Sequence, residues 1–371
     1  MGSGRQCIGE PRIRMDGGAS IQDVCHHGKN ARYLSTLYLI PTCFLSIFLK
    51  LFKSGKGDFM RYNRRDFIKT SAGLAGASAL GWLGCKQSQE TQWQGFNYAM
   101  CNEIMKGWEW ARQCDLIGQA GYTGVEIAPF SLVEKGVQEI SASERKQMVQ
   151  DMKNAGIECA GLHWLLAPPP QGLHFTTPDK SVRDKTIDYF NQLIDFCGDL
   201  GGPAMIFGSP KQRNTQGISV EEAKKNFADS LSQVADHAQE RGVKILIETL
   251  DTSQTDVVNT MAEAYQLMQT VNHPAVRMMF DFHNTPDETK SFQALVEEYY
   301  EYIEHVHVQE MDGDYLGTGN AANTFIDALQ VLKNRGFDKW VSLEVFNFEP
   351  APKTVATESM ATLKKMEAKL V

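Results

Sequence analysis

Four strand-like segments in the second half of this 371-residue chain each end in a side chain that can bind a metal ion. The segments KILIETL (244–250), VRMMFDFHN (276–284), IEHVHVQE (303–310) and KWVSLEVF (339–346) carry Glu248, Asp281, His307 and Glu344, respectively. Burying several carboxylates together without a compensating cation is very costly. The pattern therefore predicts a divalent metal site made of these four residues.

Side-chain direction within the segments supports a shared site. Successive strand residues face opposite ways, so the polar residues of each segment face one side and its aliphatic residues the other. In segment 303–310, His305 and His307 share a face opposite Val306 and Val308. We expect the polar faces to point into a closed sheet, with His305 as an interior histidine one layer below His307.

Strand-like and helix-like stretches alternate along the chain from residue 95. The expected strands are Gly95–Met100, Gly124–Pro129, Ile157–Trp164, Pro203–Ser209, Lys244–Leu250, Val276–Asn284, Ile303–Met311 and Lys339–Phe346. The expected helices include Trp110–Ala120, Ser143–Ala155, Val182–Leu200, Val220–Arg241, Thr260–Val271, Phe292–Tyr302 and Asn323–Arg335. Several helices are followed by the glycine typical of a helix end, at Gly121, Gly156, Gly201, Gly242 and Gly336.

Eight such units predict an α/β fold, a single-domain (β/α)8 TIM barrel spanning residues 86–371. The alternative is an open doubly wound sheet, but no GxGxxG motif follows the first strand. In a barrel the predicted metal ligands converge at the C-terminal ends of the strands, where such folds keep their active sites.

An export signal precedes the barrel. The run NRRDFIK (63–69) and the weakly apolar stretch up to Cys85 are typical of a twin-arginine signal peptide, here residues 60–85. Cys85 resembles a lipoprotein cleavage site, although Trp82 fits that pattern poorly. An apolar stretch at 33–52 approaches the ~20 residues of a membrane span, but a span before an export signal makes little topological sense. We expect translation to start at Met60 and residues 1–59 to lie outside the native product.

Composition narrows the class of partner. The formal net charge of −8 argues against nucleic-acid binding, which usually shows a basic stripe. Four cysteines of the barrel segment, Cys101, Cys114, Cys159 and Cys197, show no CxxC spacing, and one or two disulfides are open in an oxidising compartment. Because the twin-arginine route exports folded proteins, we expect the fold not to depend on disulfides. The expected location is periplasmic, with membrane contact only through the signal or a lipid anchor at Cys85.

Residues 95–371 resemble the xylose isomerase-like barrel superfamily, and within it the sugar epimerase and hydroxypyruvate isomerase-like branch, including ketose 3-epimerases. The motifs that carry the resemblance are IETLDTSQTDVVNT, FDFH, HVHVQEMDG, LGTGN and WVSLEVF. The resemblance implies a divalent metal held by Glu248, Asp281, His307 and Glu344. Three carboxylates and an imidazole suit Mn²⁺ best, with Mg²⁺, Co²⁺ or Zn²⁺ as alternatives.

The chemistry implied is proton transfer next to a sugar carbonyl. A metal on the carbonyl and its neighbouring hydroxyl stabilises an enediolate. In similar epimerases two metal-binding glutamates also act as the bases, here Glu248 and Glu344. One base suffices for isomerisation and two serve epimerisation, and the sequence leaves both open.

Further residues are candidates for binding a small sugar or sugar acid. They are His163 and Trp164 after the third strand, Lys211 and Arg213 after the fourth, Gln254, His283 and Glu126. The alternative for Glu126 is an internal salt bridge. Gln254 stands where similar ketose epimerases often have a glutamate, and related proteins carry the histidine one place after His283. Related proteins often have an arginine after this histidine that contacts the sugar, and no arginine follows His307 at that place.

Other functions compete with the isomerase interpretation. A metal-dependent lyase acting on keto-sugars or keto-inositols would use the same enediolate. A non-catalytic carbohydrate-binding barrel would have no reason to keep four buried ligands. A deoxyribose-repair nuclease of the same superfamily would need further His and Asp ligands and a basic DNA face. Export disfavours phosphosugars as substrates, and the barrels could pair into a homodimer.

Overall fold

The computed structural model describes residues 93–371, which belong to one compact unit, Thr91–Val371. The predictions made for the preceding segment lie outside the described residues. They concern the start at Met60, the signal 60–85, the lipid site at Cys85 and the exclusion of residues 1–59.

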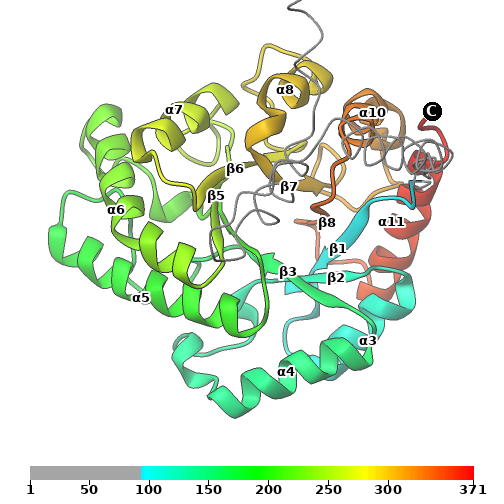
Figure 1. Ribbon diagram of the computed structural model, residues 1–371, viewed down its shortest axis with the longest axis horizontal. Coiled ribbons are helices and arrows are strands. Elements are labelled where there is room, and N and C mark those ends of the chain that lie inside the picture. Colours follow the sequence, from blue (N-terminus) through cyan, green and yellow to red (C-terminus); the bar gives the residue numbers. More distant parts are fainter. Residues whose placement is uncertain (1–92) are drawn as a thin grey trace, which may run out of the picture. The chain divides into compact units, whose positions relative to one another are not determined.

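Eight parallel strands close into a barrel whose strand order follows the chain order (Figure 1). They are β1 (Asn97–Cys101), β2 (Gly124–Ile127), β3 (Glu158–Leu162), β4 (Ala204–Phe207), β5 (Lys244–Ile247), β6 (Val276–Asp281), β7 (Ile303–Val308) and β8 (Trp340–Leu343). The last strand pairs with the first, with Asn97 opposite Trp340 and Met100 opposite Leu343. The predicted (β/α)8 barrel is confirmed, and the open-sheet alternative is excluded.

Helices follow the strands and form the outer layer (Figure 1). They are α3 (Trp110–Ala120), α4 (Ala142–Asn154), α5 (Lys180–Asp199), α6 (Val220–Glu240), α7 (Met261–Val271), α8 (Phe292–Tyr299), α9 (Ala321–Thr324), α10 (Ile326–Asn334) and α11 (Pro352–Glu367). The five glycines expected after helix ends all adopt positive φ, as a left-handed helix end requires.

Two helices differ from the expectation in their bounds. The expected helix Phe292–Tyr302 ends as α8 at Tyr299, and a 3₁₀ turn over Tyr300–Tyr302 leads directly into β7 at Ile303. The expected helix Asn323–Arg335 is broken at Phe325 into α9 and α10. Phe325 stacks on Phe282 with ring centroids 3.9 Å apart, and this packing holds the break in place.

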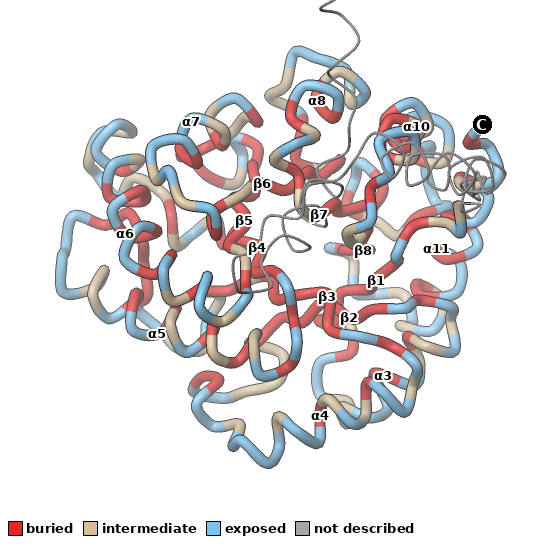
Figure 2. Tube along the Cα trace, in the orientation of Figure 1, coloured by how far each residue is buried: buried red, intermediate tan, exposed pale blue. Residues whose placement is uncertain are grey.

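The apolar core lies in two places. The larger part fills the space between strands and helices, where Figure 2 shows continuous burial along the barrel wall. Rings of Phe175, Phe190, Phe207 and Phe227 pack there at centroid distances of 5.0–6.1 Å. A separate cluster of Ala204, Ile206, Leu246 and Met279 comes from β4, β5 and β6. By strand parity Leu246 shares the face of Glu248, and Met279 that of Asp281, so this cluster supports two metal-ligand candidates from below.

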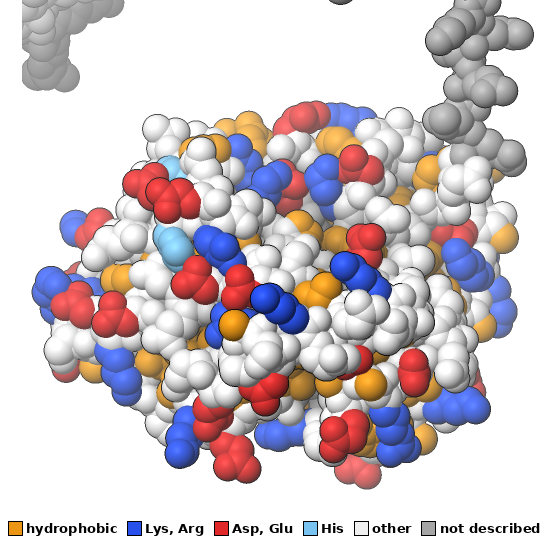
Figure 3. Space-filling model, turned by 60° about the horizontal axis from the view of Figure 1, so that its bottom comes forward, with side chains coloured by type: hydrophobic (Ala, Val, Ile, Leu, Met, Phe, Trp, Pro, Cys, Tyr) orange, Lys and Arg blue, Asp and Glu red, His pale blue; other side chains and the backbone are white. Residues whose placement is uncertain are grey.

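The surface seen in Figure 3 mixes acidic and basic side chains without a basic stripe. None of the helices in residues 93–371 combines the length and the apolar character that a bilayer crossing requires.

Phe190 provides a test of the packing between barrel and helices. We expect Phe190→Ala to lower the free energy of unfolding by about 3–5 kcal/mol, because it removes a buried ring and leaves a cavity. Phe348 is 52% exposed, so Phe348→Ala should change stability by less than about 0.5 kcal/mol. Denaturant titrations of both variants under the same buffer and metal conditions measure this difference. Equal effects of the two substitutions would contradict the packing described.

Candidate metal centre and active site

The structure brings Glu248, Asp281, His307 and Glu344 together at the C-terminal ends of β5 to β8. One ligand atom from each residue lies within 4.8 Å of the others, and all four side chains are buried. Because parallel strands end at the same rim, residues separated by up to 96 positions (248 to 344) meet at a single point.

The donor atoms fit a divalent cation. His307 Nδ1 lies 3.1 Å from Glu344 Oε2 and 3.6 Å from Glu248 Oε1. Both His307 Nδ1 and Glu344 Oε2 are buried without a hydrogen-bond partner, which is a costly arrangement unless another group binds them. Three carboxylates and a neutral imidazole nitrogen are a common donor set for Mn²⁺ or Mg²⁺.

Glu126 lies behind His307 and orients its ring. Its Oε1 is 2.9 Å from His307 Nε2, and its Oε2 is 2.7 Å from His305 Nε2. Burial alone would raise the pKa of Glu126, but His307 and His305 hold it well below its usual value. The arrangement leaves Nδ1 of His307 free for a metal, as in carboxylate–histidine–metal triads. Of the two interpretations of Glu126, these contacts match the internal salt bridge, because its fully buried carboxylate is paired with two imidazoles.

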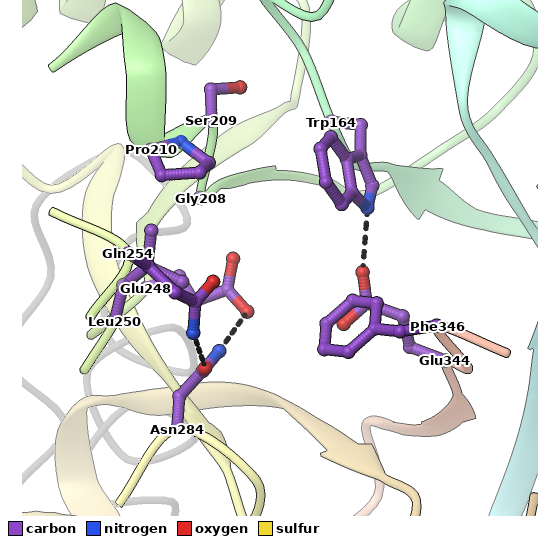
Figure 4. A pocket seen from close by; sticks show the side chains of 10 residues that line it. All are labelled: Trp164, Gly208, Ser209, Pro210, Glu248, Leu250, Gln254, Asn284, Glu344 and Phe346. Atoms are coloured by element: carbon purple, nitrogen blue, oxygen red, sulfur yellow. Dashed lines mark hydrogen bonds between the residues drawn. The ribbon is translucent and has the colours of Figure 1, made fainter. Parts of the chain in front are cut away.

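Asn284 holds the carboxylates from the other side, as Figure 4 shows for Glu248. Its Nδ2 donates to Asp281 Oδ2 at 2.6 Å and to Glu248 Oε1 at 3.3 Å. Gln254 Nε2 in turn donates to Asn284 Oδ1 at 2.7 Å and to Asp251 Oδ2 at 2.6 Å. The sequence analysis does not single out Asn284, although Asn284 directly follows the predicted substrate contact His283 in the segment FDFHN.

A pocket opens directly onto two of the four residues. It is lined by Trp164, Gly208, Ser209, Pro210, Glu248, Leu250, Gln254, Asn284, Glu344 and Phe346 (Figure 4). Glu248 and Glu344 lie on opposite sides of it in this view, with Asn284 and Gln254 beside Glu248. Glu248, Asn284 and Gln254 give one side polar groups, and on the other side the rings of Trp164 and Phe346 lie beside the Glu344 carboxylate.

Trp164 is fixed in place by its hydrogen bond and its backbone. Its Nε1 donates to Glu344 Oε1 at 2.9 Å, and its ring packs edge-on near Phe130 and Phe346 at 6.2 and 6.4 Å. Its φ of 49° is rare for a side-chain-bearing residue and costs about 1–3 kcal/mol. Such strain is typical of functional sites, and this one aims an indole at a pocket-lining carboxylate.

Several predicted substrate contacts lie elsewhere. His283 is half-buried, lies outside the group of converging ligands, and packs its ring on Phe346 at 5.0 Å. Lys211 is exposed and does not line the pocket. His163 is buried between Glu103 and Glu126, with Nε2 3.0 Å from Glu103 Oε2 and Nδ1 3.4 Å from Glu126 Oε1. A hydroxyl contact by His163 is thus not what the structure shows, because both ring nitrogens face carboxylates.

Arg213, predicted as a substrate contact, does not line the pocket. Its side chain is fully buried, and Nη1 donates to the carbonyl oxygens of Glu248 at 2.6 Å and Phe207 at 3.1 Å. Nη2 donates to the carbonyl oxygen of Val258 at 3.3 Å. Arg213 therefore fixes the backbone that carries Glu248, a role that its place on a polar loop does not reveal.

The LGTGN motif also has a structural role. The backbone N–H groups of Gly317 and Ala321 both donate to Glu310 at 2.9 Å. A Cβ on Gly319 would come within 2.5 Å of Glu310 Oε2. The loop is therefore folded around the buried Glu310 carboxylate just after β7.

The chain matches the family model described as xylose isomerase-like TIM barrel over residues 114–366. It belongs to this family. A model of the twin-arginine translocation signal sequence matches residues 61–81. The expected family and the expected type of export signal are therefore both supported.

Several curated relatives are named as isomerases or epimerases. A probable ketose 3-epimerase of Synechocystis is 28% identical over 48% of this chain, which spans 63% of that protein's length. The inosose isomerase of Bacillus subtilis is 28% identical over 53% of this chain and 73% of its own. A ketose 3-epimerase of Arthrobacter globiformis is 27% identical over 59% of this chain and 74% of its own.

Solved structures share the fold. D-psicose 3-epimerase of Clostridium cellulolyticum, solved with D-tagatose, gives a TM-score of 0.64 at 18% identity, covering 74% of this chain and 99% of that one. The 3-keto-D-glucoside 4-epimerase of E. coli gives 0.62 at 15% identity, covering 74% and 99%.

Gly208 tests how tightly the metal-ligand carboxylates are packed. A Cβ at this position would lie 2.1 Å from Glu248 Oε2, so Gly208→Ala must displace that carboxylate. We expect Mn²⁺ affinity to fall about 10–100-fold, as when a supporting group of a metal ligand is disturbed. Calorimetric titration with Mn²⁺ measures the change. Gly198 lies within α5, where a Cβ would meet only the flexible Arg241 side chain at 3.1 Å, so Gly198→Ala is the control and should bind Mn²⁺ normally.

Metal binding should release protons. Burial and the nearby Glu248 raise the pKa of Asp281 well above its usual value. Burial alone would lower the pKa of His307, but Glu126 and Glu344 raise it well above its usual value. Both groups therefore hold a proton more tightly in the metal-free protein than they would in water, and each must be deprotonated to bind a cation, so affinity should fall as pH decreases. Titrations in buffers of different ionisation enthalpy count the protons, and a pH-independent affinity would contradict this account.

Proposed function

We propose that this protein is an exported, metal-dependent sugar isomerase or epimerase that transfers a proton at a carbon next to a carbonyl. The observation that carries the proposal is the position of Glu248 and Glu344 on opposite sides of one pocket, next to a cluster of metal-binding side chains. The family membership and the activities named for its curated relatives support it.

The four residues Glu248, Asp281, His307 and Glu344 would hold one divalent cation, for which we propose Mn²⁺. When bound, this cation supplies positive charge to the carbonyl oxygen as negative charge develops there. Glu248 and Glu344 then exchange protons with the carbon from the two sides of the pocket. Asn284 and Glu126 orient the carboxylates and the imidazole, and Trp164 keeps water from one side of the substrate.

The pocket supports a neutral sugar or keto-sugar as substrate. Of its lining residues, all within the described range 93–371, none is a lysine or an arginine that could pair with a carboxylate or phosphate. The apolar rings of Trp164 and Phe346 suit the C–H face of a sugar ring, while Gln254 and Asn284 offer hydrogen bonds to hydroxyls. This argues for an unphosphorylated neutral substrate over a sugar acid.

The match to a twin-arginine signal supports delivery of the folded barrel, residues 86–371, to the periplasm. The start at Met60 and lipid attachment at Cys85 belong to the same proposal. Export of a folded protein also agrees with the four free, buried cysteines, Cys101, Cys114, Cys159 and Cys197.

Solvent exchange tests the proposed reaction. We expect a panel of neutral ketoses and keto-glycosides, incubated in D₂O with the Mn²⁺-loaded protein, to gain deuterium on a carbon next to the carbonyl in at least one member. Glu248→Gln and Glu344→Gln should each reduce the exchange rate at least about 10²-fold, the usual contribution of a general base. Mass spectrometry and proton NMR measure the exchange.

Glu349→Gln is the matched control, because it makes the same chemical change at an exposed carboxylate after β8. It should leave exchange at the wild-type rate. A product lighter by one water would indicate a lyase instead. Absence of exchange across the whole panel, with metal bound, would reject the isomerase proposal.

A further inference from the structure

A second group of metal-binding side chains shares Glu344 with the first. Glu103, His163 and Glu344 each offer a ligand atom, and these atoms lie within 4.8 Å of one another. Glu103 begins the 3₁₀ turn Glu103–Met105 just after β1, and His163 directly follows β3. All three side chains are buried, and the proposed proton transfer gives Glu103 no role.

The contacts of Glu103 are incomplete. Its Oε2 lies 3.0 Å from His163 Nε2, but its Oε1 is buried without any hydrogen-bond partner. Glu344 Oε1 accepts a hydrogen bond from Trp164, and its Oε2 faces His307 without a hydrogen bond. A buried carboxylate oxygen left like Glu103 Oε1 is costly, so a further positive group is expected beside it.

Charge balance leads to the same expectation. Five carboxylates are buried in and beneath the site, those of Glu103, Glu126, Glu248, Asp281 and Glu344. One divalent cation would offset two of the four negative charges of Glu103, Glu248, Asp281 and Glu344 and leave two unpaired in a medium of low polarity. The group of Glu126, His305 and His307 needs no ion, because each oxygen of Glu126 already pairs with an imidazole.

We propose that Glu103, His163 and Glu344 bind a second divalent cation, so that Glu344 bridges a two-metal centre. The donor set of two carboxylates and one imidazole suits the same class of ion, Mn²⁺ or Mg²⁺. The proposal deepens the proposed function, because a carboxylate shared by two cations is a weak base. Glu248 would then be the stronger base and remove the proton, and Glu344 would return a proton from the other side of the pocket.

The rival occupant of this position is a proton. Burial alone would lower the pKa of His163, but Glu103 and Glu126 raise it to about 9. An imidazolium paired with Glu103 would supply one positive charge instead of two. Metal stoichiometry distinguishes the two states, because only the cation adds a second ion per chain.

The test is to load the metal-free protein with MnCl₂ and to count bound ions by elemental analysis after desalting. We expect two Mn²⁺ per chain and the exchange-coupled electron paramagnetic resonance signal of a close pair. Glu103→Gln and, separately, His163→Asn should bind one Mn²⁺ each and give the signal of an isolated ion. Glu349→Gln should still bind two, and circular dichroism checks that each variant is folded.

A wild-type protein that binds a single Mn²⁺ would overturn the proposal, whatever the variants do. Retention of two coupled ions in both Glu103→Gln and His163→Asn would overturn it as well. These outcomes are separate from failure of the proposed function. Two bound ions without deuterium exchange would support the two-metal centre and reject the proposed reaction. One bound ion with deuterium exchange would support the reaction and reject the two-metal centre.

Discussion

The burial of several carboxylates at one end of a closed barrel is the constraint on which this structure depends. Glu248, Asp281 and Glu344 have little access to water, and their mutual repulsion must be offset by a cation, by protons or by hydrogen-bond donors. The surrounding residues offset this repulsion in different ways. Asn284 donates to two of the carboxylates, Trp164 donates to the third, and His307 presents a free nitrogen to the same point.

Support for the site extends well beyond the residues that line the pocket. Glu126 fixes the ring of His307, Arg213 fixes the backbone of Glu248, and Gln254 fixes Asn284. Beneath them the apolar cluster around Leu246 and Met279 fills the interior. Such buried support limits the freedom of the ligand atoms, which is what a metal site with defined geometry requires.

The fold and the convergent ligands could be predicted from the sequence because both depend on local pattern. Strand parity put Glu248, Asp281, His307 and Glu344 on interior faces, and the βα repeat placed their strand ends at one rim. Once eight units are recognised, the closed barrel brings distant residues together without further information. The glycines after the helices marked the element boundaries in the same local way.

The second layer of the site could not be predicted, because it depends on which side chains reach each other across the barrel. Arg213 and Glu126 are polar residues for which the sequence suggested substrate contacts. Only the three-dimensional contacts show that Arg213 bonds the backbone of Glu248 just after β5 and that Glu126 pairs with the histidines of β7. Glu103 lies in a short turn after β1 and has no sequence motif. Asn284 is not predicted because the adjacent His283 has a side chain that is more often found in metal and substrate sites.

Anomalous X-ray diffraction from a crystal of the Mn²⁺-loaded protein would test the central claim most directly. The account predicts a manganese peak within about 2.0–2.6 Å of one atom from each of Glu248, Asp281, His307 and Glu344, the range for hard divalent ions. A loaded protein without a peak among these four residues, or with its manganese bound elsewhere, would contradict it.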